Sequence, residues 1–245
     1  MLVRALKAEQ LKLRNSPIWM AFFIIPFISA VMGTFNYLNN TEVLSKEWYS
    51  LWTQHTLFYC YFCFPALIGV YCSYICRLEH MNNNWNGVMT MPIKISTIYF
   101  SKLITVIKIT LCTQILVGIL FYISGRIVGF HIPMPNELFL WLLFGFFASI
   151  AISSLQLAFS LVMRSFSIPI GIALIGGILG LVISAKGFGL YFPYSLFSIG
   201  MCSNNPSGNM EYDMITFMIS CIVFVMIFSG LSILKMKRVG KDFLS

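Results

Sequence analysis

The sequence contains few charged residues. Of its 245 residues, 10% are charged, and Asp and Glu together number only eight, whereas soluble domains carry about 25% charged residues. Long polar segments are also lacking, so no connection between the apolar runs has room for a folded nucleotide-binding or catalytic domain. These absences exclude an ordinary soluble protein. We therefore predict one membrane domain that covers residues 1–245.

Motifs for nucleotide binding and catalysis are missing as well. The sequence has no G-x-x-x-x-G-K-[ST] loop for phosphates, no H-E-x-x-H and no G-x-S-x-G, which are the patterns of P-loop ATPases, zinc proteases and serine hydrolases. Paired acids are absent from the apolar runs, where a membrane hydrolase would need them. We therefore predict that this chain is not an enzyme and binds no metal or other cofactor itself.

Seven cysteines are present, and most of them lie in apolar runs. Cys60 and Cys63 share one predicted helix with Cys72 and Cys76, and His55 is nearby. This spacing admits a metal or redox site, but a tetrahedral metal site needs four ligands and no second Cys/His cluster completes the set. We favour the interpretation that these cysteines serve as small apolar residues.

What the sequence has instead is six long uncharged runs, at 18–41, 48–76, 109–125, 138–163, 165–185 and 214–234. A hydrocarbon core of about 30 Å is crossed by roughly 20 apolar residues in a helix. The runs therefore predict an all-α, polytopic membrane protein with six transmembrane helices, at about 18–38, 54–76, 104–125, 138–162, 167–185 and 214–234.

The basic residues fall mainly on one side of this arrangement. Twelve Lys and Arg residues lie on the side of the two termini, and Lys46, Arg126 and Lys186 lie on the other. Since cytoplasmic loops are enriched in Lys and Arg, both termini are predicted in the cytoplasm. The net charge of +8 is then explained by topology and by contact with anionic membrane lipid, and we predict no nucleic-acid partner.

The stretch 187–210 is uncharged and fairly apolar, yet it is rich in Gly, Pro and Asn. A seventh span there would move the basic cluster at 235–238 to the outer side, against the charge rule. We therefore predict an outer re-entrant or interfacial segment between the fifth and sixth spans.

The N-terminal segment 1–16 has the pattern of a short amphipathic helix in the inner interface, with leucines on one side and bases mostly on the other. Glu9 departs from this pattern because it falls on the leucine side. Either Glu9 pairs with a neighbouring base such as Lys12, or it contacts a protein partner.

The connection 77–102 is the longest one predicted in the cytoplasm. Leu78, Met81 and Trp85 recur at i, i+3 and i+7, which predicts a short amphipathic helix beneath the membrane. Lys102 would mark the point where the chain enters the membrane. This helix is either a docking surface for another protein or a helix that faces lipid.

With these two segments and the six spans, the sequence resembles a known family. Glu9 and Lys12 in an E-x-x-K pattern, the six spans, and Arg77, Glu79, Trp85, Gly87 and Pro92 with a later lysine are similar to permease subunits of type 2 ABC exporters. More narrowly, residues 78–80, 82–85 and 187–196 resemble the permeases that protect bacteria against lantibiotics and other bacteriocins.

The resemblance implies a coupling helix, at about 78–91, that sits in a groove of a separate ATPase subunit, which would bind ATP and Mg. It also implies that the N-terminal helix lies near the ATPase. The residues expected to couple this chain to the ATPase are Glu9, Leu78, Glu79, Met81, Trp85, Met91 and Pro92.

The resemblance favours a permease that dimerises with itself or a related permease and expels an antimicrobial peptide from the bacterial plasma membrane. Four acids predicted on the outer side would attract a cationic part of that peptide: Glu42, Glu47, Glu211 and Asp213. Two alternatives stay open, a lipid or small-drug exporter of the same fold and a non-transporting anchor or sensor subunit.

Overall fold

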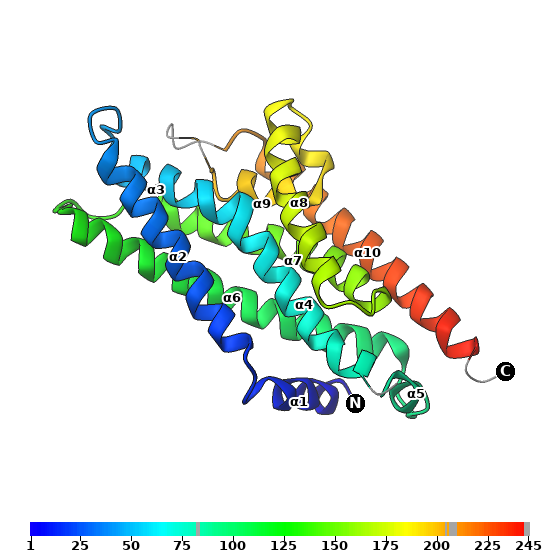
Figure 1. Ribbon diagram of the computed structural model, residues 1–245. Helices are drawn as coiled ribbons and strands as arrows, with labels where there is room; N and C mark the ends of the chain where they lie inside the picture. The colour runs from blue at the N-terminus through cyan, green and yellow to red at the C-terminus, as the bar shows by residue number, and fades with distance from the viewer. Residues whose placement is uncertain (82–83, 204, 206–209, 243–245) are drawn as a thin grey trace.

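The computed structural model describes residues 1–245 except 82–83, 204, 206–209 and 243–245, and its described part is helical without a strand, as predicted. Figure 1 shows long helices that run side by side, with shorter helices at both ends of the bundle. The α-helices are α1 (Leu2–Leu13), α2 (Ile18–Asn39), α3 (Glu47–Phe58), α4 (Phe64–His80), α5 (Asn84–Met89), α6 (Ile95–Val128), α7 (Glu137–Val162), α8 (Ser167–Ala185), α9 (Pro193–Gly200) and α10 (Met214–Asp242).

Six helical segments of the described chain are long and apolar enough to cross a membrane, which confirms the predicted number of spans. They are Ile18–Asn39, Glu47–His80, Ile95–Val128, Glu137–Val162, Ser167–Ala185 and Met214–Arg238. The second and third each have 34 residues and so are about 51 Å long at 1.5 Å per residue. Because the hydrocarbon core is only about 30 Å thick, both helices extend beyond it.

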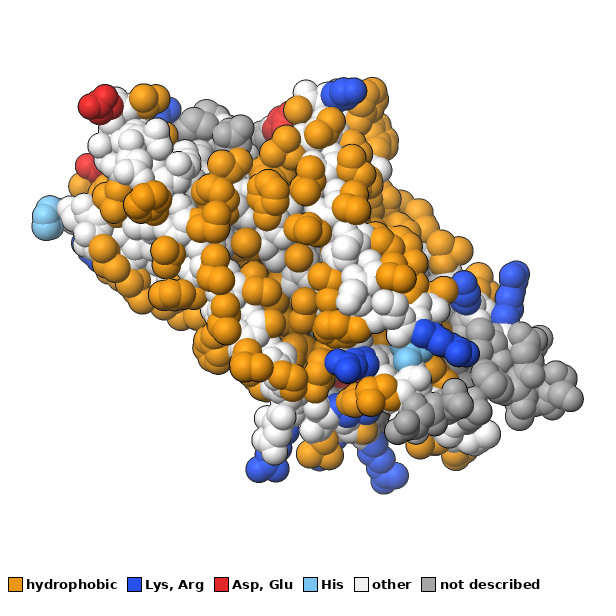
Figure 2. All heavy atoms as spheres, viewed as in Figure 1, with side chains coloured by type: hydrophobic (Ala, Val, Ile, Leu, Met, Phe, Trp, Pro, Cys, Tyr) orange, Lys and Arg blue, Asp and Glu red, His pale blue; other side chains and the backbone are white. Residues whose placement is uncertain are grey.

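The bundle has two distinct ends (Figure 1). One end carries α1, α5 and the last turns of α10, and we call it the α5 end. The opposite end carries the loop between α2 and α3 together with α9, and we call it the α9 end. Most Lys and Arg side chains visible in Figure 2 gather at the α5 end, and the flank between the two ends is largely hydrophobic. This distribution agrees with the charge asymmetry of the sequence.

A π-helical segment, Tyr59–Cys63, joins α3 to α4 within one continuous helix. Pro65 lies two residues after this segment, and a proline lacks the N–H that would bond the carbonyl four residues earlier, here that of Tyr61. An ideal α-helix would also bring the proline ring against that carbonyl. The wider π turn accommodates both the missing N–H and the bulk of the proline ring. Gly177 of α8 packs against the Tyr61 carbonyl, where a side chain has no room.

Aromatic residues fill the core nearer the α9 end. Trp52 of α3 donates a hydrogen bond from Nε1 to the carbonyl of Met201 at 2.8 Å, which ties α3 to the end of α9. Phe64 and Phe197 stack with ring centres 4.2 Å apart, so α4 also contacts α9. The short helix α9 packs mainly against α7 and α8, and these two contacts connect it to α3 and α4 as well.

The structure corrects the helix predicted over 78–91. Helix α4 continues through Leu78 to His80, Met81 then has an extended backbone with ψ 140°, and a separate helix of six residues forms α5. Leu78, Met81 and Trp85 therefore do not form a stripe on one helix. The spacing of these three residues does not correspond to one helix, because Leu78 belongs to the last turn of α4 and Trp85 belongs to α5.

Residues 187–210 contain two short helical pieces, Gly189–Tyr191 and Pro193–Gly200. Gly187 has a positive φ of 79° where α8 ends, a conformation that favours glycine. The Asn and Pro residues at 204 and 206 lie outside the described residues. That this segment is re-entrant or interfacial stays a prediction.

Candidate functional site

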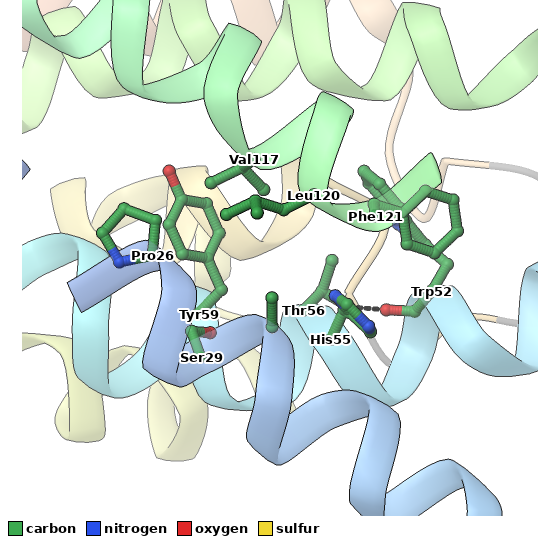
Figure 3. A pocket seen from close by; sticks show the side chains of 10 residues that line it. Pro26, Ser29, Trp52, His55, Thr56, Tyr59, Val117, Leu120 and Phe121 are labelled. Carbon is green, nitrogen blue, oxygen red and sulfur yellow. Dashed lines mark hydrogen bonds between the residues drawn. The ribbon is translucent and has the colours of Figure 1, made fainter. Parts of the chain in front are cut away.

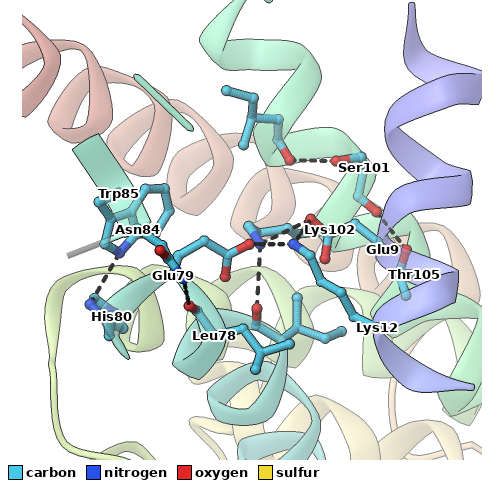
Figure 4. A network of polar contacts seen from close by, with 12 residues as sticks. Glu9, Lys12, Leu78, Glu79, His80, Asn84, Trp85, Ser101, Lys102 and Thr105 are labelled. Atoms are coloured by element: carbon cyan, nitrogen blue, oxygen red, sulfur yellow. Dashed lines mark hydrogen bonds and ion pairs between the residues drawn. The ribbon is translucent and has the colours of Figure 1, made fainter. Parts of the chain in front are cut away.

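Four charged side chains meet at the α5 end, where α1, α4 and α6 come together (Figure 4). Lys102 of α6 contacts the Oε1 atoms of Glu9 at 3.0 Å and Glu79 at 2.7 Å through its Nζ atom. Lys12 pairs with the same two oxygens, that of Glu9 at 3.0 Å. We call this set, Glu9, Lys12, Glu79 and Lys102, the charge cluster.

Three of the four members of the charge cluster are removed from solvent. The exposed fraction is 0% for Lys102, 3% for Glu79 and 5% for Glu9, and the side chain of Lys12 is 30% exposed. Two carboxylates balance two ammonium groups, so the cluster has no net charge. Nevertheless, the Oε2 atoms of Glu9 and Glu79 are buried without a hydrogen-bond partner in the described chain. Such a cluster is sensitive to the loss of any one member, because an unpaired charge would remain buried.

The helical faces explain why these side chains meet. Glu79 continues the buried face of α4 that carries Cys72 and Cys76, since residues three or four apart lie on one side of a helix. Lys102 lies on the buried face of α6 with Ile98 and Thr105. Each charged residue therefore extends an otherwise uncharged buried face.

Helix α5 is connected to the charge cluster through Trp85. The Nζ atom of Lys102 lies 5.9 Å from the centre of the Trp85 ring, within the range of a cation–π interaction. Trp85 also donates from Nε1 to Nδ1 of His80 at 3.1 Å, and Nε2 of His80 lies 2.8 Å from the carbonyl of Ser160 on α7. Because Nδ1 accepts and the carbonyl can only accept, these bonds require the neutral imidazole with its proton on Nε2.

The predicted coupling residues separate into two groups. Met81, Met91 and Pro92 are exposed at the α5 end, whereas Leu78 and Trp85 are partly buried. Glu9 and Glu79 are buried in the charge cluster, so of the two alternatives for Glu9, the structure has the pairing with a base. The exposed group is accessible to a partner protein, whereas the buried group is not.

Sequence reasoning did not find Lys102 and His80 as members of this site. Lys102 was predicted only to mark the start of the membrane, yet it is fully buried. A signal was present, because Lys102 shares a helical face with the small polar residues Ser101 and Thr105, which are also buried, whereas Lys108 points elsewhere and is exposed. For His80 the sequence contains no comparable signal.

The four acids predicted on the outer side, Glu42, Glu47, Glu211 and Asp213, are all exposed. Asp213 has a structural role, because its Oδ2 atom accepts hydrogen bonds from the backbone N–H groups of Ile215 at 3.1 Å and Thr216 at 3.3 Å. Asp213 thus caps the N-terminus of α10.

The cavity around His55, shown in Figure 3, is too small for a transported molecule. Its volume is about 10 Å³, which is at the lower limit for one water molecule. His55 itself is 5% exposed and lies 3.0 Å from the hydroxyl of Thr34 through Nε2. The histidine therefore packs α3 against α2.

The cysteines have no partner thiol in the described chain: all seven are free. Cys60, Cys72 and Cys76 are buried in the core, which is the use of cysteine that the sequence favoured. After α9, burial raises the pKa of the Cys202 thiol to about 12, because the thiolate is disfavoured away from water. This thiol therefore stays protonated near neutral pH.

The chain matches the family described as "ABC-2 family transporter protein" over residues 5–180. Comparisons with curated proteins and with solved structures gave no significant match. The family match includes α1, the charge cluster and α5, and it covers most of the chain. The protein therefore belongs to the ABC-2 family of transporter proteins and is a multi-pass membrane component of an ABC transporter, and family membership implies an ABC ATPase as its partner.

Proposed function

We propose that this chain is the permease subunit of an ATP-driven exporter that expels an antimicrobial peptide of the lantibiotic or bacteriocin class from a bacterial plasma membrane. The α5 end and both termini lie in the cytoplasm in this proposal, because Lys and Arg gather there (Figure 2). Two permease chains, identical or related, associate with two ATPase subunits that bind ATP and Mg. The substrate class rests on the sequence resemblance at residues 78–80, 82–85 and 187–196.

The charge cluster is the observation that carries the coupling part of the proposal. The ATPase contacts the exposed residues Met81, Met91 and Pro92 beside α5. A displacement of α5 reaches Lys102 through Trp85, and it reaches α7 through His80. Glu9 and Glu79 hold Lys102 in place and act as positioning residues. Since the cluster joins α1, α4 and α6, these three helices move together.

In this proposal the peptide contacts the permease from within the membrane and at the outer surface. The exposed surfaces of the spans are apolar, as the flank in Figure 2 illustrates, and they would contact its apolar part. The exposed acids at the α9 end would attract its cationic part. Such surface charges act mainly at low ionic strength, because salt screens them.

The docking surface can be tested by co-purification with the ATPase. We expect the double variant Met81→Asp, Met91→Asp to weaken the complex at least about tenfold, because truncating or charging a central apolar contact costs about 2 kcal/mol or more. The matched control is Val43→Asp, which changes a residue that is 83% exposed at the α9 end. An unchanged complex with the double variant would reject this docking surface, and no complex with any ATPase would favour the anchor or sensor alternative.

The outer acids can be tested by neutralising them together, with Glu42→Gln, Glu47→Gln, Glu211→Gln and Asp213→Asn. Asparagine caps a helix about as well as aspartate, so the start of α10 is preserved. We expect cellular protection against a cationic peptide to fall about two- to fivefold, which corresponds to the free energy that one exposed ion pair contributes. Protection against a neutral peptide analogue serves as the control. Equal protection of the variant and the parent against the cationic peptide would remove the acids from the mechanism.

A further inference from the structure

An apolar groove runs between α6 and α7 in the half of the bundle nearer the α9 end. Its volume is about 460 Å³, within the range of about 300–1,000 Å³ that is typical of ligand pockets. Its walls include Ile115, Ile119 and Tyr122 from α6 and Leu138, Phe139 and Leu142 from α7. Gly118 lies between the α6 residues and adds no side chain, which keeps the groove open.

The groove opens sideways toward the membrane rather than into the bundle. Its rim is exposed, with exposed fractions of 56% for Ile115, 52% for Ile119 and 57% for Phe139. In a bilayer an empty space of this size would lose dispersion contacts on one side, and its apolar walls give water few partners. A hydrocarbon chain would supply the missing contacts.

Hydrocarbon alone does not select one lipid, because lipid tails are as apolar as the helices that they surround. Selection needs a polar contact beyond the groove, and Arg126 provides one. It lies four residues after Tyr122 on α6, which is about 6 Å toward the helix end. Its Nε atom donates to the Tyr122 hydroxyl at 3.1 Å, and the guanidinium carbon lies 5.2 Å from the centre of that ring.

The guanidinium of Arg126 keeps free donors. Besides the bond to Tyr122, it donates from Nη1 to the carbonyl of Phe130 at 2.9 Å, so two of its five N–H groups are used. No carboxylate of the described chain lies within 4.0 Å of it. On α7, Glu137 accepts a hydrogen bond from the Tyr49 hydroxyl at 3.3 Å. The remaining N–H groups of Arg126 suit an oxyanion such as a phosphate.

The end of α6 holds Arg126 in this position. Gly129 has a φ of 100°, which favours glycine, and its N–H bonds to the Arg126 carbonyl at 3.2 Å. The N–H of Phe130 bonds to the Gly125 carbonyl at 3.0 Å, and the two bonds together form a Schellman motif. The motif brings the Phe130 carbonyl back to the arginine side chain, which fixes the guanidinium beside the groove.

We propose that the groove and Arg126 form a binding site for one anionic phospholipid. One acyl chain lies between α6 and α7, and the headgroup phosphate binds the guanidinium of Arg126. The residues from Ile115 to Tyr122 extend about 10 Å along the helix, so the groove holds the part of the chain nearest the headgroup. The site requires neither the proposed peptide substrate nor the ATPase, and it therefore goes beyond the proposed function.

The site can be tested by photo-crosslinking of the full chain in nanodiscs. The probes are phosphatidylglycerol and phosphatidylcholine that carry the same acyl chains with a diazirine in one chain. We expect crosslinks to concentrate on the groove walls rather than on Ile175 of α8, which is 59% exposed. We also expect about fivefold more crosslinking at the groove from phosphatidylglycerol, the effect of one basic residue on an anionic lipid.

Two pairs of variants separate the chain contact from the headgroup contact. Arg126→Gln should remove the preference for phosphatidylglycerol, whereas Lys186→Gln at the same end should keep it. Ile119→Trp fills the groove and should abolish its crosslinks, whereas Ile175→Trp should leave them unchanged. All four positions are exposed, so the fold tolerates the changes, and the melting temperature of each variant verifies this.

Several results would overturn the proposal. Equal crosslinking at the groove and at α8 would show that the groove contacts only the ordinary lipid that surrounds the protein. Equal crosslinking by the two phospholipids would show that Arg126 does not select the headgroup. Protein–protein crosslinks from the groove would assign it to a second copy of the chain. Soluble glycerol phosphate is the last control: if it competes with phosphatidylglycerol, the site binds free phosphate and not a lipid.

Discussion

Replacing Lys102 with methionine is expected to destabilise the protein by about 3–5 kcal/mol, the cost of removing one partner from a buried ion pair. Methionine has similar length and no charge, so the change leaves Glu9 and Glu79 with Lys12 as the one remaining cation of the charge cluster. For a chain of this size, the melting temperature in detergent should fall by roughly 10 °C. Tryptophan fluorescence during heating measures this change.

The matched control is Lys108→Met on the same helix, because Lys108 is exposed and surface substitutions usually change stability by less than about 0.5 kcal/mol. Equal melting temperatures for the two variants would contradict the assigned cluster. The double variant Lys102→Met, Glu79→Gln removes one charge of each sign, and we expect it to recover most of the lost stability. If the cluster also couples the helices to the ATPase, this double variant will be stable and will still fail to protect cells against the peptide.

The second large effect is expected from Gly177→Ala in α8. A Cβ atom at this position would lie 2.3 Å from the carbonyl oxygen of Tyr61 and 3.0 Å from Cγ of Pro65. Because the nearer obstacle is backbone, α8 must move away from the π-helical segment. We expect a loss of about 3 kcal/mol, the upper part of the range for overpacked cores.

Gly171→Ala in the same helix should have the opposite sign. No atom lies within 4 Å of a Cβ built at Gly171, and alanine is favoured over glycine in a helix by roughly 0.5–1 kcal/mol. The same chemical change therefore lowers the melting temperature at one position of α8 and raises it at another. A similar response at both positions would show that the contact between α8 and the Tyr61 carbonyl does not limit the packing.

The sequence predicted the six spans because each one is an uncharged run long enough to cross a bilayer, and this signal does not depend on tertiary contacts. It underestimated the second and third helices because charged residues such as Arg77 and Lys102 resemble loops in a hydropathy pattern, while the helix continues past them. Helix α4 runs through Arg77 to His80, for example. The break after His80, where the backbone of Met81 is extended, is not a feature that periodicity predicts.

The candidate site was predicted in part. Glu9 was selected because it falls on the leucine side of the N-terminal helix, and Glu79 was selected from the family resemblance; both belong to one cluster. Their contact with Lys102 could not be predicted, because it depends on how α1 and α4 pack against α6. The groove beside Arg126 was also missed, since it arises from the spacing between two helices and from the missing side chain of Gly118. Pairwise packing of helices, rather than the pattern along any one of them, creates both sites.

The charge cluster also has a consequence for how the protein is made. Glu9 and Lys102 are separated by 93 positions, and synthesis proceeds from the N-terminus, so Glu9 leaves the ribosome before its buried partner Lys102 has been added. During that interval Lys12 is the member of the charge cluster that can neutralise Glu9. Helices α1 and α4, which carry the two acids, cannot complete the charge cluster until α6 has been made. A chain that stops before α6 therefore holds two acids of the cluster against one base, Lys12, whereas the finished fold holds two acids and two bases.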